Sequence, residues 1–106
     1  MSVMMIWTLD VDPERVDEVG ELVAARREQV QRHSCRGLRM FRVVDGDHDG
    51  VRMIAIEEFD SRAHLQSFGE SQPNDAEAQA TIAKTFAPVG PLTVIGMQTV
   101  EELDTT

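Results

Sequence analysis

Short apolar stretches alternate along the chain with longer stretches in which apolar residues recur every three or four positions. The short stretches are rich in β-branched residues, which is typical of strands, and they cover residues 3–9, 38–44, 51–59 and 92–100. Stretches with helical spacing follow the first and the third of them. The pattern therefore predicts the element order β-α-β-β-α-β.

The first helix is predicted over residues 13–32. Asp12 is suited to cap its free N–H groups, and Pro13 fits the first turn, where a missing donor does no harm. Valines form one apolar stripe at positions Val16, Val19, Val23 and Val30. Acidic residues come first and arginines follow, an order that complements the helix dipole.

The second helix is predicted in two pieces. Asp60 and Ser61 begin the first piece, which ends at Gly69, and residues 73–75 begin the second, which ends before Pro88. A polar loop over residues 45–50 joins the second and third strands as a β-hairpin.

This order predicts an α+β domain of the ferredoxin-like split βαβ type, with an antiparallel four-stranded sheet covered by helices on one face. Nothing in the sequence divides residues 1–106 into two domains. The polar tail after about residue 101 is expected to fray.

Both faces of the predicted sheet are apolar. In the first strand, Met5, Trp7 and Leu9 oppose Met4 and Ile6. In the third strand, Ile54 and Ile56 oppose Met53, Ala55 and Phe59. In the last strand, Leu92, Val94 and Gly96 oppose Ile95 and Met97.

The chain has helices to cover only one of these faces. A bare apolar face favours association with a second copy, so we expect a two-fold homodimer in which the sheets of two subunits pack as a barrel. The alternative is a second face of merely mixed character.

Composition narrows the possible partners. The chain has 106 residues, and 10 Lys and Arg against 19 Asp and Glu give a net charge of −9. This charge argues against binding nucleic acid or an anionic membrane surface. The first apolar run, residues 3–7, is much shorter than the roughly 18 residues of a spanning helix. The single cysteine excludes an intrachain disulfide and fits a reducing compartment, so we expect a cytoplasmic protein.

No metal or cofactor site is predicted. Residues 45–50 match the opening of an EF-hand loop, but the twelfth position is Ile56 and strands flank the loop, which we interpret as a solvated hairpin tip. His33 and Cys35 are two positions apart, yet nothing nearby completes four zinc ligands. Glycine-rich nucleotide-binding motifs are also absent from the sequence.

Three segments together resemble the antibiotic biosynthesis monooxygenase family of dimeric α/β barrels. They are LDVDPE at residues 9–14, SCRG at residues 34–37 and IEEFDSRA at residues 56–63. The likeness extends from residue 3 to about residue 100. It implies a substrate pocket in each subunit, between the sheet and its helices. Family members include cofactor-independent monooxygenases of anthrone- or quinol-type aromatics and haem-degrading enzymes.

The haem-degrading branch is disfavoured by the residues at its characteristic positions. This branch has an asparagine where this chain has Trp7, a tryptophan where it has Phe68, and a ligating histidine where it has Ala78. The chain also has no tyrosine, so a phenolic proton donor is excluded.

The resemblance and the residue types together nominate a site. Trp7 is either a wall of an aromatic pocket or a core residue, and the predicted substrate-binding residues are Trp7, Phe68, Phe86, Phe59 and Met40. His64 is the predicted catalytic base, and the alternative is an exposed helix histidine. One of Glu57 and Glu58 must face inwards, to orient a ligand or, more simply, to pair with Arg42.

The leading prediction is a cofactor-independent monooxygenase that acts on an aromatic, anthrone- or quinol-like metabolite. The alternative is a non-catalytic module of the same fold that binds or senses a small hydrophobic aromatic ligand. A dimer with a filled core and no pocket is the third possibility.

Overall fold

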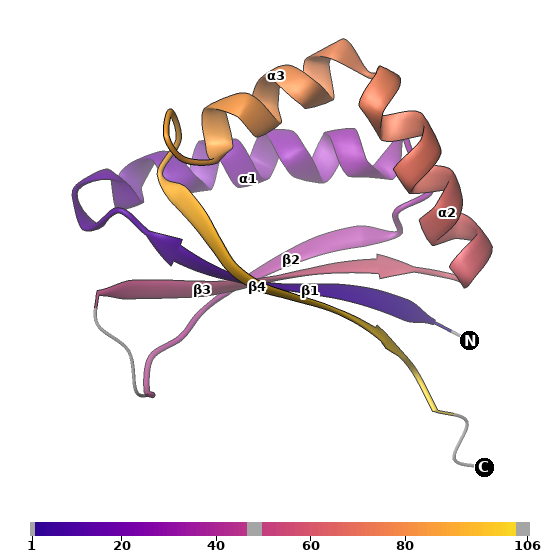
Figure 1. Ribbon diagram of the computed structural model, residues 1–106, viewed down its shortest axis with the longest axis horizontal. Coiled ribbons are helices and arrows are strands. Elements are labelled where there is room, and N and C mark those ends of the chain that lie inside the picture. The colour runs from indigo at the N-terminus through magenta and orange to yellow at the C-terminus, as the bar shows by residue number, and fades with distance from the viewer. Residues whose placement is uncertain (1, 47–49, 104–106) are drawn as a thin grey trace.

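The computed structural model describes residues 2–46 and 50–103 of the chain. Within these residues, four strands and three α-helices, with two short 3-10 turns, follow the predicted order (Figure 1). They are β1 (Val3–Val11), η1 (Pro13–Arg15), α1 (Val16–Gln31), β2 (Gly37–Arg42), β3 (Val51–Phe59), α2 (Arg62–Ser71), η2 (Gln72–Asn74), α3 (Ala76–Thr85) and β4 (Leu92–Glu101). The ferredoxin-like α+β fold is confirmed.

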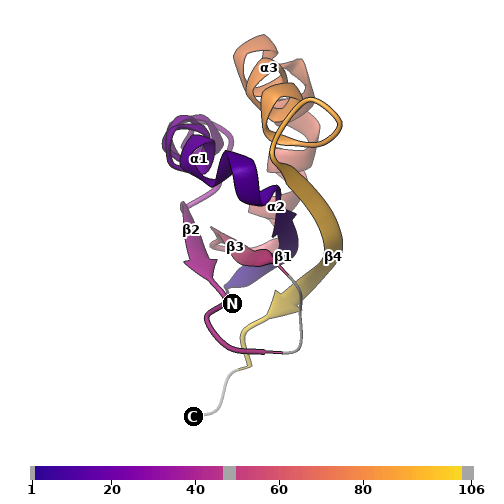
Figure 2. The ribbon, with the colours of Figure 1, turned by 90° about the vertical axis from the view of Figure 1, so that its left-hand side faces the viewer.

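The four strands form one antiparallel sheet in the order β2-β3-β1-β4. Figure 2 shows α1, α2 and α3 on the same side of this sheet, and no helix of the described part of the chain covers the other side. In the pairing of β1 with β3, Met5 lies opposite Glu57 and Trp7 opposite Ala55. Trp7 and Glu57 are therefore diagonal neighbours on the face that the helices cover.

Side chains cap the predicted helix starts. The Asp12 carboxylate accepts from the backbone N–H of Glu14 at the start of η1, and Asp75 accepts in the same way from Ala78 at the start of α3. Ser61 caps α2. The predicted end of α2 at Gly69 is wrong, because the helix continues to Ser71 before η2, which contains a proline, interrupts it.

The register of β4 contains a bulge that the sequence pattern did not predict. The pairing with β1 shifts between Thr8 and Leu9, so that Gly96 lies opposite Thr8 and Met97 opposite Trp7. Opposite residues of an antiparallel pair share a face, so Met97 lies on the face of Trp7 and Gly96 on the other face. The prediction that Gly96 shares a face with Leu92 and Val94 is therefore wrong, because the bulge shifts the alternation between Val94 and Gly96.

Two clusters of buried residues fill the space between sheet and helices. One contains Leu9, Val11, Val19, Ala55 and Leu92. The other contains Val30, Cys35, Phe59 and Phe68, and the rings of Phe59 and Phe68 meet edge to face with centroids 5.1 Å apart. Each cluster ties α1 to the sheet, and the second also ties α2 to it.

The uncovered face of the sheet carries apolar side chains, as predicted. Phe41 is 45% exposed there, and the register places it opposite Ile54. The half-buried apolar residues of this face are Met4, Ile6, Ile54, Ile56 and Val100. Ion pairs of Arg52 with Asp10 and of Arg39 with Glu58 lie among them.

The hairpin between β2 and β3 is present, but residues 47–49 of its predicted tip lie outside the described residues. Within the part of the chain that the structure describes, none of the helices has the length and apolar character needed to cross a membrane.

Candidate functional site

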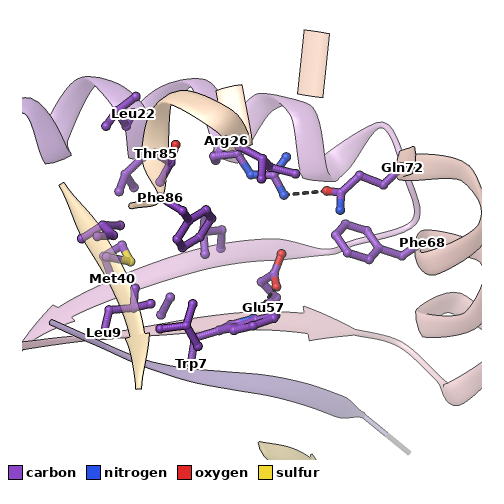
Figure 3. A pocket seen from close by; sticks show the side chains of 16 residues that line it. Trp7, Leu9, Leu22, Arg26, Met40, Glu57, Phe68, Gln72, Thr85 and Phe86 are labelled. Atoms are coloured by element: carbon purple, nitrogen blue, oxygen red, sulfur yellow. Dashed lines mark hydrogen bonds between the residues drawn. The ribbon is translucent and has the colours of Figure 1, made fainter. Parts of the chain in front are cut away.

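A cavity of about 240 Å³ lies between the sheet and the helices (Figure 3). Side chains from all four strands and all three helices line it, and most of them are apolar. The lining residues are Trp7, Leu9, Leu22, Val23, Arg26, Leu38, Met40, Ala55, Glu57, Phe68, Gln72, Ile82, Thr85, Phe86, Leu92 and Val94. The lining is what a small apolar ligand needs: a mostly hydrophobic wall with a few polar groups.

Four of the five predicted binding residues lie together in this lining. Trp7 and Met40 come from the sheet, whereas Phe68 and Phe86 come from the helical side. Phe59 does not line the cavity: it is fully buried, and its ring meets the ring of Phe68 edge to face. Its place in the core fixes the ring of Phe68 at the cavity wall.

Glu57 brings a carboxylate to the cavity from β3. Only 6% of the residue is exposed, and its Oε1 accepts a hydrogen bond of 2.8 Å from the indole Nε1 of Trp7. Burial raises the pKa of this carboxyl, and the hydrogen bond from Trp7 and the positive charge of Arg26 oppose that rise. A buried carboxylate of raised pKa is a stronger base than an exposed one.

The predicted pairing with Arg42 is wrong for both glutamates. Glu57 bonds to Trp7, and Glu58, on the opposite face, accepts from Arg36 and from Arg39. Arg42 is exposed near the end of the edge strand β2.

Arg26 is a polar residue of the cavity that the sequence analysis did not nominate. It lies on α1, and its guanidinium donates to the side-chain oxygens of Gln72, at 2.5 Å, and Gln29, at 3.3 Å. Its position was visible in the sequence, because it falls three residues after Val23 and four before Val30, within the apolar stripe. A positively charged residue within the apolar stripe of a helix was the signal that could have identified Arg26 as a residue of the cavity.

His64, the predicted base, does not line the cavity. It lies in the first turn of α2 and is exposed, with its ring Nδ1 2.7 Å from Ser61 Oγ. The backbone N–H of His64 donates to the same hydroxyl. The helix cap therefore holds this residue at the protein surface, and the structure does not bring it together with Trp7, Phe68 and Phe86.

His33 and Cys35 have separate structural partners. The ring nitrogens of His33 lie 2.9 Å from Ser71 Oγ and 2.7 Å from Asp75 Oδ2, which joins the end of α1 to the break between α2 and α3. The hydrogen bond with His33, with a smaller contribution from the backbone N–H of Ala78, lowers the pKa of Asp75 to about 2. Burial raises the pKa of the Cys35 thiol to about 11, so this thiol is a poor nucleophile.

Several solved structures share this fold. A protein from Bordetella bronchiseptica that is assigned to the antibiotic biosynthesis monooxygenases is 18% identical, with a TM-score of 0.67 and with 96% of this chain and 97% of that chain covered. A second one, from Caulobacter crescentus, is 19% identical, with a TM-score of 0.64 and with 97% of this chain and 91% of that chain covered. A heme-degrading protein from Mycobacterium tuberculosis is 18% identical, with a TM-score of 0.60 and 100% of both chains covered. These identities establish likeness of fold.

Ala78, which the resemblance places where the haem-degrading branch has a ligating histidine, is fully buried and has only a methyl side chain. A comparison with curated proteins finds no significant match. The profile of one family, described as antibiotic biosynthesis monooxygenase, matches residues 2–84. The chain therefore belongs to the antibiotic biosynthesis monooxygenase family.

Proposed function

We propose that this protein is a cofactor-independent monooxygenase that oxidises a reduced aromatic metabolite of the anthrone or quinol type. The observation that carries the proposal is a buried carboxylate, Glu57, held by the indole of Trp7 at the wall of an apolar cavity. Membership of a monooxygenase family supports the same class of reaction.

Glu57 takes the place of His64 as the proposed base. A base works best when its pKa lies near the working pH, and burial moves the pKa of Glu57 upwards from its ordinary value. His64 would need to leave its helix cap to reach the cavity. Glu57 already faces the space that a ligand would occupy.

The proposed reaction draws every electron from the substrate. Glu57 removes a proton from the substrate, and the resulting electron-rich anion gives an electron to dioxygen. For an anthrone-type methylene, one oxygen atom becomes the new carbonyl oxygen. The other leaves as water together with the two methylene hydrogens, so that no external reductant is consumed.

The size of the cavity supports a flat ligand of modest size. If a ligand fills 240 Å³ at the packing density of a protein interior, about 0.74, its own volume is about 180 Å³. This corresponds to two or three fused aromatic rings. Trp7, Phe68 and Phe86 offer ring faces and edges against which such a ligand can pack.

We also propose that two copies associate through the uncovered face of the sheet. Phe41 and its apolar neighbours on that face would otherwise stay in water, and their burial contributes about 25 cal/mol per Å². The ion pairs among them would provide polar contacts in the interface. A two-fold pairing lets each copy cover the other.

Oxygen uptake with anthrone as the probe tests the proposed reaction. The expected result is uptake above the protein-free rate and incorporation of one ¹⁸O atom from ¹⁸O₂ into the product carbonyl. Quenching of Trp7 fluorescence by anthrone without any uptake would instead support the non-catalytic binding module. The absence of both quenching and uptake would contradict the pocket itself.

A further inference from the structure

Arg26 carries a charge that no carboxylate of the described residues neutralises in an ion pair. Its two hydrogen-bond acceptors, Gln72 and Gln29, are neutral amides, and among residues 2–46 and 50–103 no carboxylate forms an ion pair with it. Its guanidinium is half-buried, and burial lowers its pKa. Because a guanidinium stays protonated in proteins, the residue keeps a partly desolvated positive charge at the cavity wall.

Glu57 faces the same cavity from the opposite side. Figure 3 shows Arg26 on the α1 side and Glu57 above the sheet, with the ring of Phe68 beside the gap. The two charges influence each other's pKa, although they do not form an ion pair. Within the described residues, Trp7 is the one side chain that donates a hydrogen bond to the Glu57 carboxylate.

Arg26 supplies hydrogen-bond donors to the cavity and the Glu57 carboxylate supplies acceptors, so the two side chains complement an oxygen that is both donor and acceptor. We propose that Arg26 and Glu57 together bind the hydroxyl of an aromatic ligand, a phenol or the enol form of a ketone, with Arg26 selecting the ionised form. The O–H group donates to Glu57, and the oxygen lone pairs accept from the Arg26 fork.

Transfer of the proton from the ligand hydroxyl to Glu57 leaves the summed charge of the ligand, Glu57 and Arg26 unchanged. The ligand O–H bond breaks, an O–H bond forms on the Glu57 carboxyl, and the negative charge moves to the ligand oxygen beside Arg26. The cavity holds one positive and one negative charge before and after the step. In surroundings of low dielectric this avoids the cost of creating a new buried charge.

The proposal disfavours a carboxylate ligand. An aromatic carboxylate would pair with Arg26 but would face the negative charge of Glu57. An aromatic ether would accept from Arg26 but would donate nothing to Glu57, and an aromatic hydrocarbon would form a hydrogen bond with neither side chain. The three ligand types therefore differ in a way that binding measurements resolve.

2-Naphthol is a suitable probe, because it has two fused rings and its anion absorbs at longer wavelength than the neutral form. We expect the ionisation midpoint of bound 2-naphthol to lie at least about one pH unit below that of the free compound. 2-Methoxynaphthalene and 2-naphthoate should each bind at least about tenfold more weakly. A bound 2-naphthol with an unshifted midpoint would overturn the proposal.

Variants separate Arg26 from general effects on the fold. Arg26→Met should abolish the shift of the midpoint and weaken binding of 2-naphthol about tenfold. Arg26→Lys keeps the positive charge but loses the planar set of guanidinium N–H donors, so it should retain part of the midpoint shift and part of the affinity. Arg27→Met is the matched control, because exposed Arg27 bonds to the backbone oxygen of Leu38 and does not line the cavity. Equal behaviour of Arg26→Met and Arg27→Met would contradict the proposal.

This inference rests on the proposed function for the role of Glu57 as proton acceptor, but its test does not require turnover. A shifted midpoint without oxygen uptake would support the binding group and reject the monooxygenase. Oxygen uptake that is unaffected in Arg26→Met, with no shift for 2-naphthol, would reject only the role of Arg26.

Discussion

The indole Nε1 of Trp7 donates a 2.8 Å hydrogen bond to Oε1 of Glu57. The two residues lie 50 positions apart in the sequence and come together because β1 pairs with β3 in a register that makes them diagonal neighbours. The one tryptophan of the chain thus orients the one carboxylate that lines the cavity among the described residues.

Removing this hydrogen bond should change the pH dependence of the reaction. In Trp7→Phe the indole N–H that lowers the pKa of Glu57 is lost, so the pKa should rise further. The acidic limb of the kcat/KM profile should then move to higher pH, as measured by oxygen uptake. Glu58→Gln, which changes the neighbouring residue on the other face, should leave the limb in place. An unmoved limb in Trp7→Phe would refute the role of Glu57 as base.

Glu57 should reduce the stability of the folded protein at neutral pH. Its raised pKa means that the folded state binds its proton more tightly, so stability falls as pH rises from the ordinary value of 4.5 through the folded-state pKa. Glu57→Gln, which keeps an acceptor for Trp7, should raise the Tm at pH 7 but not near pH 4. Glu58→Gln is the control and should lower the Tm at pH 7, because the hydrogen bond with Arg36 lowers the pKa of Glu58 and its carboxylate therefore stabilises the folded state. A lower Tm of Glu57→Gln at pH 7 would contradict this account.

Phe59 should stabilise the folded protein, because its buried ring packs against Phe68 on the side away from the cavity. It is fully buried, so Phe59→Ala should lower the free energy of unfolding by about 3–5 kcal/mol, as measured by urea denaturation. Val44→Ala, at a position 90% exposed, should change it by about 0.5 kcal/mol or less. A cost below about 1 kcal/mol at Phe59 would show that the core does not depend on this ring.

The uncovered sheet face should hold two copies together. Sedimentation at micromolar concentration should give the mass of a dimer for the unchanged protein. Phe41→Glu, which places a charge on that face, should give the mass of one subunit with an unchanged circular dichroism spectrum. Val44→Glu, outside the sheet, should remain a dimer. A single subunit for the unchanged protein would reject the proposed interface.

The fold was predictable because each local signal agrees with the others. The caps at Asp12, Ser61 and Asp75 and the apolar stripe of the first helix are read directly from residue types and spacing. The bulge in β4 was not predictable in this way, because pairing with β1 determines it and β4 itself contains no local mark of the extra residue beyond Gly96.

The aromatic walls of the site were more predictable than its chemistry. Trp7 and Phe68 were nominated from residue type together with the family resemblance, and the inward direction of one glutamate followed from strand alternation. The partner of Glu57 depends on register and side-chain reach, which a strand pattern does not contain. Arg26 was passed over because an arginine in a helix is usually solvated, although its place in the apolar stripe distinguished it.

The rate of oxygen uptake by Glu57→Gln, beside that of His64→Ala, tests the central claim most directly. With anthrone as substrate, the account predicts a loss of at least about 100-fold for Glu57→Gln and a change of no more than about twofold for His64→Ala. Full activity of Glu57→Gln, or loss of activity in His64→Ala alone, would contradict it.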